Sequence, residues 1–480
     1  MIPAGPISSR IWRPALLLVL SSVLLLQHAA GQDTGDPEMR DACDPDLVDW
    51  SGALGRSFQR NGQAVYELTE PVLLQCTTEL TARFGIDEGD NRYRFEGDVR
   101  VVERGDTVYA DNMLYFSDSQ IGEATGNVLI TDGRIQLTAP EALYFSEEKR
   151  TVFNAGVQFQ DSSTVLTSNR GTYWSDEAIA EFNDSVVLLQ DSLEVRADSL
   201  TYWRYSEDSF ARGDVYVERR DGDILKALGR RLYHAAGRDS THLSGDVDLL
   251  QVLTDDARMD SLFVRSDDLF LAADDSASHL LAVGNVGVVR GGLSVAGDTL
   301  TVDRDQDGAA SSTRMTGTPI AWLGGTQISS EVIRLTRRNG ILDSLQASRN
   351  VFVAQEDTLL GRIQQLKGRM LEGVFENDSL RLMTVAPNAE ALYYVEAEED
   401  GEQAAVFSTA DRIVFVFEGG EVADVRSYDG IDGALYPSNI IDQAQDLDGF
   451  SWRPEDRPLL EAYRSRWLAR LARLSGRNSP

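Results

Sequence analysis

The chain has 480 residues, of which 77 are acidic and 45 are basic, and its formal net charge is −32 at pH 7. Such a charge repels phosphate backbones and anionic surfaces, so nucleic-acid binding is excluded as the source of function. The acidic residues are spread along the whole chain, which indicates a heavily solvated surface.

The first 31 residues have the pattern of a signal peptide. Arg10 and Arg13 precede an apolar run over residues 15–26, and small residues follow at 29–31. The run is shorter than the roughly 20 residues that a membrane-spanning helix needs. We therefore expect residues 1–31 to be cleaved after export, with a retained signal anchor as the alternative. Residues 32–64 are acidic and rich in Gly, Asp and Pro, and predict a poorly ordered lead-in.

Cys43 and Cys76 are the two cysteines of the chain. In an oxidising compartment they are candidates for a disulfide, with two unpaired structural thiols as the alternative. Their spacing suits no metal site.

A short motif that ends in Val recurs along the chain. The Val lies at a spacing of 29 residues four times in succession, and the register then loosens without stopping, so that nine units are visible. The regular copies are Phe95-Glu-Gly-Asp-Val99, Ala124-Thr-Gly-Asn-Val128, Phe153-Asn-Ala-Gly-Val157, Phe182-Asn-Asp-Ser-Val186 and Ala211-Arg-Gly-Asp-Val215.

Each unit predicts two strands. The residue two positions after the marker Val is also apolar, as at Val101 and Ile130, and this period of two is typical of a half-buried strand. A second apolar pair follows after a turn, as at Val108 and Ala110, and a Tyr then ends the unit. The apolar columns of the first and second strands are expected to face each other across a core.

A two-stranded unit cannot bury its apolar face alone, so the units must stack. We predict an all-β, elongated, solenoid-like body over residues 65–390, with regular repeats at 95–240 and looser ones at 241–390. Residues 391–453 are predicted to be a C-terminal β segment of the same fold.

The repeats resemble the OstA-like family, which includes the periplasmic lipopolysaccharide-transport protein LptA and the N-terminal part of LptD. The resemblance is carried by Ala110-Asp111-Asn-Met-Leu114-Tyr115 and Ala197-Asp198-Ser-Leu200-Thr-Tyr202, and it covers about residues 65–390. Residues 388–394 and the strand at 412–417 are similar to the tail of OstA-like proteins of the Bacteroidetes type.

The resemblance implies a folded-over β-jelly roll, V-shaped in section, whose two sheets enclose an apolar groove for the acyl chains of lipopolysaccharide. The candidate groove-lining residues are Val99, Val101, Val128, Ile130, Val157, Phe159, Val186, Leu188, Val215 and Val217. The alternative is that these side chains simply fill a core, in a structural or surface β-solenoid with no lipid cargo.

The resemblance also implies a location and partners. We expect a periplasmic protein, with outer-membrane association as a further option. The expected partners are lipopolysaccharide and Lpt-type inner- and outer-membrane proteins that add their edge strands to the sheets. Head-to-tail self-association is another option.

No nucleophile elbow, phosphate loop or paired metal-ligand spacing occurs in the sequence, so neither an enzyme nor a cofactor is expected. Asp303, Asp305 and Asp307 precede Gly308 in the manner of a calcium loop. The twelfth position of that loop is Arg314, where an EF-hand needs Glu, so a turn between strands is the favoured interpretation.

The last segment, residues 454–480, predicts a basic amphipathic helix and a tail. Leu460, Tyr463, Trp467, Leu471 and Leu474 recur at helical spacing with Arg between them. The apolar stripe either caps the open end of the stack or docks on an anionic membrane surface or a partner.

Overall fold

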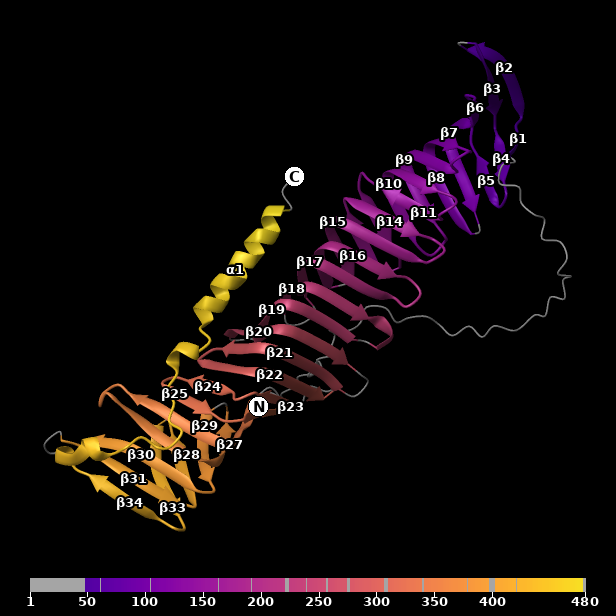
Figure 1. Ribbon diagram of the computed structural model, residues 1–480. Helices are drawn as coiled ribbons and strands as arrows, with labels where there is room; N and C mark the ends of the chain where they lie inside the picture. The colour runs from indigo at the N-terminus through magenta and orange to yellow at the C-terminus, as the bar shows by residue number, and fades with distance from the viewer. Residues whose placement is uncertain are drawn as a thin grey trace, which may run out of the picture. The chain divides into compact units, whose positions relative to one another are not determined.

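The computed structural model describes residues 48–477 except 61, 104, 163, 191, 221–223, 239, 256–257, 274–276, 306–309, 339–340, 378, 397–401 and 420. It consists of antiparallel strands followed by one α-helix (Figure 1), so the predicted all-β class with a C-terminal helix is confirmed. The predicted signal peptide and Cys43 lie outside the described residues. Within the described part of the chain, no helix combines the length and apolarity needed to cross a membrane.

The chain divides into two compact units. The described residues of the N-terminal unit are 48–217 and 233–237, and those of the C-terminal unit are 218–232 and 238–477. The strands up to the division are β1 (Asp49–Ser51), β2 (Leu54–Arg60), β3 (Gln63–Thr69), β4 (Val72–Gln75), β5 (Thr78–Thr81), β6 (Phe84–Asp87), β7 (Arg92–Glu103), β8 (Asp106–Phe116), β9 (Ile121–Thr131), β10 (Gln136–Phe145), β11 (Arg150–Phe153), β12 (Val157–Gln160), β13 (Thr164–Ser168), β14 (Arg170–Trp174), β15 (Ile179–Gln190), β16 (Leu193–Trp203), β17 (Asp208–Arg219) and β18 (Ile224–Ala235).

β17 and β18 cross the division, and the elements after them belong to the C-terminal unit. They are β19 (Ser240–Asp255), β20 (Arg258–Ala273), β21 (Ala277–Arg290), β22 (Leu293–Asp305), β23 (Ala310–Thr316), β24 (Ile320–Leu323), β25 (Thr326–Ser329), β26 (Val332–Arg338), β27 (Ile341–Asp357), β28 (Arg362–Glu376), β29 (Ser379–Ala386), β30 (Ala389–Glu396), β31 (Gln403–Ala410), β32 (Arg412–Glu418), β33 (Glu421–Tyr428), β34 (Asp432–Tyr436) and α1 (Leu460–Arg477).

The β fold begins earlier than the sequence predicts. Residues 48–64 fall within the expected lead-in, yet β1 pairs with β4 and β2 pairs with β3. Because the partner strands lie in the predicted repeat domain, backbone pairing orders this polar stretch without help from a buried face.

The repeat marker forms a corner within a strand. In β7 the pairing with β8 shifts register between Glu96 and Val99, and the two residues between them, Gly97 and Asp98, both have positive φ angles, +77° and +47°. Such a bulge bends a strand sharply while hydrogen bonding continues on both sides. In β7 the marker therefore separates two halves of one strand, whereas at residues 154–156 the same corner divides β11 from β12.

Corners of successive strands lock together through a side chain. Asn127 Nδ2, at the corner of β9, donates a hydrogen bond to Asp111 Oδ2 of β8 at 2.8 Å. The same contact joins Asn285 and Asp267 in the C-terminal unit, also at 2.8 Å. The Asp of the Ala-Asp motif and the Asn before the marker Val of the Gly-x-Val motif are thus the two partners of one repeated contact.

The bent strands place their two halves in two facing sheets, as a folded-over jelly roll requires. Val99 pairs with Ala110, and Val101 pairs with Val108. The two predicted apolar columns are therefore neighbours in one sheet, and the expectation that they face each other is wrong. The residues across the corner from them, on the second sheet, are also buried: Phe95, Met113, Ala124, Ala142, Phe153, Ala180, Phe182, Leu200 and Ala211.

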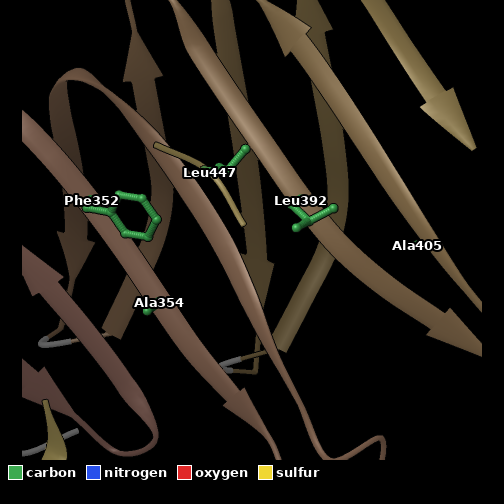
Figure 2. Packing of buried hydrophobic residues seen from close by; sticks show 5 residues of the cluster. All are labelled: Phe352, Ala354, Leu392, Ala405 and Leu447. Carbon is green, nitrogen blue, oxygen red and sulfur yellow. The ribbon is translucent and has the colours of Figure 1, made fainter. Parts of the chain in front are cut away.

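Residues after β34 cover the outer face of the C-terminal unit. Leu447 joins a buried cluster with Phe352, Ala354, Leu392 and Ala405, which β27, β30 and β31 provide (Figure 2). Buried glutamines hold the same tail. Gln365 Oε1 accepts the backbone N–H of Leu447 at 2.9 Å, and Gln327 Nε2 donates to the carbonyl of Ser451 at 2.7 Å.

Helix α1 continues this cover over β19–β22. Arg466 and Arg470 both bond the buried carboxylate of Asp248, Trp467 is buried, and a Cβ added to Gly287 would lie 1.9 Å from the hydroxyl of Tyr463. In the structure the apolar stripe therefore faces the outer side of the sheet rather than the end of the stack.

Candidate functional site

The ten predicted groove residues lie on the inner face of the first-sheet halves. Eight of them are buried, with Val99 and Val128 each only 1% exposed, whereas Leu188 and Val217 are half-buried. Because the column and its partners on the second sheet leave so little exposed surface, most of the interior is filled by the protein's own side chains.

Two pockets open beside this column in the N-terminal unit. The first has a cavity of about 20 Å³, and it is lined by Val101, Val108 and Ile130 below Glu103 and Tyr144. The second, also of about 20 Å³, is lined by apolar residues such as Leu80, Val101 and Met113 and by the polar ends of Gln75, Tyr115 and Tyr144. The pockets lie where the apolar interior meets polar side chains at the strand ends.

These polar strand ends form the mouth of the jelly roll, on the side opposite the corners. On the first sheet the inward residues at the strand ends are Gln75, Glu103, Asp132, Asp161 and Gln190, and on the second sheet they are Tyr115, Tyr144, Tyr173 and Tyr202. Each set recurs with the repeat, so the mouth is as periodic as the core beneath it.

Hydrogen bonds cross the mouth at three successive levels. Tyr115 donates its hydroxyl to Gln75 Oε1, and Tyr144 donates its hydroxyl to Glu103 Oε2. At the third level Arg204 Nη2 donates to Asp132 Oδ2.

Neighbouring side chains extend two of these crossings. Lys149 Nζ also donates to Glu103, and Arg204 Nη1 reaches the Tyr173 hydroxyl at 3.4 Å. The partners are 40, 41 and 72 residues apart in sequence at the three levels, because they end strands of opposite sheets.

Burial at the mouth changes the acidity of its side chains. Loss of water and, less strongly, the Glu103 carboxylate raise the pKa of Tyr115 to about 12. Burial and the hydrogen bond to Glu103 raise the pKa of Tyr144 well above its usual range. Burial and then the Asp132 carboxylate raise the pKa of Asp106. The mouth is therefore polar and acidic, but poorly hydrated.

The carboxylate side of the mouth is absent from the sequence prediction. Glu103, Asp132, Asp161 and Gln190 follow one another at the 29-residue spacing of the marker Val, and this spacing is the signal that could have identified them. The tyrosine side does appear in the predicted pattern, as the residue that ends each unit.

The other predicted sites have ordinary surroundings. Asp303 lies in β22 and bonds His279 at 2.8 Å, while Asp305 accepts the backbone N–H of Ala310 at 3.1 Å. Asp307 lies outside the described residues. In the described ranges no three His, Cys, Asp or Glu side chains gather as a metal site would require. Cys76 is disulfide-bonded.

Each of the two units exposes an edge strand. Among the described strands, β2 pairs with β3 alone, and all seven of its residues are exposed. At the other end β33 pairs with β32, and its Val422 and Val425 are 50% and 52% exposed. Unpaired backbone groups beside exposed apolar side chains are able to accept a further strand.

Comparisons with known proteins match one part of the chain. Residues 88–198 match the family described as OstA-like protein. Among solved structures, the chain is similar to LptH, the LptA homologous periplasmic component of the conserved lipopolysaccharide transport device from Pseudomonas aeruginosa. The identity is 15%, the TM-score is 0.20, and the match covers 23% of this chain and 75% of that chain. No curated protein matches.

Proposed function

We propose that the N-terminal unit carries the acyl chains of lipopolysaccharide through the periplasm toward the outer membrane, and the match of residues 88–198 to the family described as OstA-like protein supports this. The observation that carries this proposal is the apolar column between the two sheets, together with the two pockets that open beside it. The column recurs with each repeat, so neighbouring positions offer a chain similar surroundings. The proposed role is binding and transfer without a chemical reaction or a cofactor.

The energetics of acyl chains favour such a column. Each exposed methylene costs about 0.8 kcal/mol in water, so a lipid that crosses an aqueous compartment needs a continuous apolar surface. Apolar contact is not directional. A chain held by Val101, Ile130 and Phe159 would therefore meet no strong barrier between one repeat and the next.

The exposed edge strands support a bridge between partners. A neighbouring sheet that pairs with β2 of the N-terminal unit or with β33 of the C-terminal unit would continue the sheet of that unit into the next protein. We propose that Lpt-type inner- and outer-membrane proteins supply these strands, and that a second copy of this chain could do so head to tail.

A structural β-solenoid without cargo is the second candidate, and the dense interior favours it. Val99, Phe153 and Val186 are each only 1% exposed, and hydrogen bonds cross the mouth at three levels. A carrier must therefore open, whereas a structural protein need not.

Site-specific photo-crosslinking distinguishes the two functions. A photoreactive residue at Val128 or Phe159, which point inward, should form lipopolysaccharide adducts in cells, whereas one at the exposed Gln158 on the same strand as Phe159 should form few. Equal adduct frequencies at Phe159 and Gln158 would contradict a lipid carrier and leave the structural solenoid.

A further inference from the structure

Side chains that meet across the mouth of the N-terminal unit close it, and the contacts between them are of a kind that can break and form again. The three crossings, Tyr115 to Gln75, Tyr144 to Glu103 and Arg204 to Asp132, join the free ends of strands in opposite sheets. We call these three pairs the latches. Below them the sheets are held by buried apolar side chains, and at the corners β7 and β8 each run from one sheet into the other.

The first two latches, Tyr115 to Gln75 and Tyr144 to Glu103, also lie directly on the pockets. Tyr144 lines both of them, Glu103 lines the first, and Gln75 and Tyr115 line the second. Val101 and Val108 lie beneath, again in both pockets. A chain that enters from the mouth must therefore pass between a tyrosine and its partner to reach the apolar column.

We infer that the three latches form a gate along the mouth. The gate admits an acyl chain when the tyrosine and arginine side chains of the latches break their hydrogen bonds across the mouth and bond instead to water or to the polar group of the lipid. This inference rests on the proposed function and adds how the interior is reached.

The chemistry of the latches suits repeated opening. A hydrogen bond across the mouth is replaced by one to water when it breaks, so its net contribution to stability is small. Separating the apolar faces beneath would instead expose hydrocarbon, which water cannot compensate. Opening is therefore expected first at the latches, as a local event that leaves the corners intact.

The charges at the mouth restrict which headgroup can replace the latches. Lys149 and Arg204 are the cations there, and each is held by a carboxylate, Glu103 or Asp132. Two further carboxylates, those of Asp106 and Asp176, lie near them, since burial and then the charges of Asp132, Glu103 and Asp176 raise the pKa of Asp106. We therefore expect a hydroxyl-bearing, saccharide-like group at the mouth to be favoured over a bare anion.

Thiol accessibility tests the gate without any lipid. A Val101→Cys variant, kept oxidised so that Cys76 stays bonded, is labelled with N-ethylmaleimide and followed by mass spectrometry. Tyr144→Phe, which removes the hydroxyl and keeps the ring, should raise the labelling rate about ten- to a hundredfold, in line with the loss of one hydrogen bond to a charged group. Tyr109→Phe, on the exposed face of β8, should leave the rate unchanged.

A second thiol separates local opening from unfolding. Ala211→Cys reports on a fully buried position of the second sheet away from the first two latches. If Tyr144→Phe accelerates labelling at Val101→Cys but not at Ala211→Cys, the gate is supported. Equal acceleration at both positions, or none at either, overturns it. Should Tyr144→Phe fail to fold, Tyr115→Phe tests the neighbouring latch in the same way.

A lipid arm ties the gate to the cargo. With a photoreactive residue at Phe159, Tyr144→Phe should increase the rate at which purified lipopolysaccharide is crosslinked, whereas a short bismaleimide strap across Glu103→Cys and Tyr144→Cys should reduce it. An unchanged rate in both variants overturns the gate while the carrier function stands. If neither the natural protein nor any variant forms adducts, the carrier function fails, and the thiol labelling still decides whether the latches open.

Discussion

The carboxylate of Asp111 occupies the space in which a side chain at Gly126 would begin. A Cβ built on Gly126 would lie 2.5 Å from Asp111 Oδ2, and the residue has a φ of +77°. Two requirements therefore act at one corner, a left-handed backbone and the close approach of the preceding strand. Gly133, in a turn with a φ of +84°, carries the backbone requirement but has no atom within 4 Å of its missing side chain.

We predict that Gly126→Ala destabilises the protein by about 2–4 kcal/mol, whereas Gly133→Ala costs about 1 kcal/mol. The strained backbone destabilises both variants. Gly126→Ala in addition displaces Asp111 and breaks the hydrogen bond that Asp111 accepts from Asn127. Urea denaturation followed by circular dichroism measures both losses. Equal losses would mean that the corner contact contributes nothing.

The repeats could be predicted from the sequence because burial alternates along a strand and recurs every 29 residues. Val99 and Val128 are therefore correctly assigned to the inner face. The corners could not be predicted in this way. Gly97-Asp98 has the composition of a turn between strands, and nothing else in the sequence indicates two successive positive φ angles inside a strand. For this reason the prediction assigned the opposing column to Val108 instead of Met113.

The mouth and the outer cover were harder to predict, for different reasons. With 77 acidic residues in the chain, Glu103 and Asp132 stand out only through their period. The partners of the C-terminal helix have no such period: Arg466 meets Asp248 from 218 residues away, so the amphipathic pattern shows that a face is covered but not what covers it.

Asp106 is predicted to destabilise the protein at neutral pH. Its pKa is raised in the folded state, so the favourable contribution of the protonated form is present below the unfolded pKa of 3.8 and is lost as the pH rises through the folded value. Asp106→Asn should therefore increase the free energy of unfolding at pH 7, by no more than about 1 kcal/mol because the group is partly solvated. The gain should vanish well below pH 3.8. Asp411→Asn, at an exposed position, is the control, and an equal gain there would contradict the prediction.

The mouth tyrosines should make the protein sensitive to alkali. The pKa values of Tyr115 and Tyr202 are about 12 in the folded state and 10 in the unfolded state, so stability should be retained below pH 10 and fall as the pH approaches 12. Absorbance at 295 nm, which reports tyrosinate, should show a late phase in this range. Tyr115→Phe should reduce its amplitude, and Tyr205→Phe, at a residue 83% exposed, should not. If both variants reduce it equally, Tyr115 does not titrate late.

The contact between α1 and the sheet should depend on Asp248. Its side chain, 8% exposed, accepts bonds from Arg466 at 3.0 Å and Arg470 at 2.5 Å, so Asp248→Ala leaves two cations partly buried without their shared anion. We expect a loss of about 2–4 kcal/mol in the docking of the helix. Trp467, which is buried in the folded protein, should become accessible to acrylamide quenching, and proteases should cut within residues 460–477 at lower concentrations.

Asp343→Ala removes an exposed pair with Arg338 at 3.5 Å and should change neither measurement, because such pairs contribute little. If Asp248→Ala leaves the helix as protected as Asp343→Ala does, then apolar contacts such as that of Tyr463 with Phe263 hold it without the ion pairs.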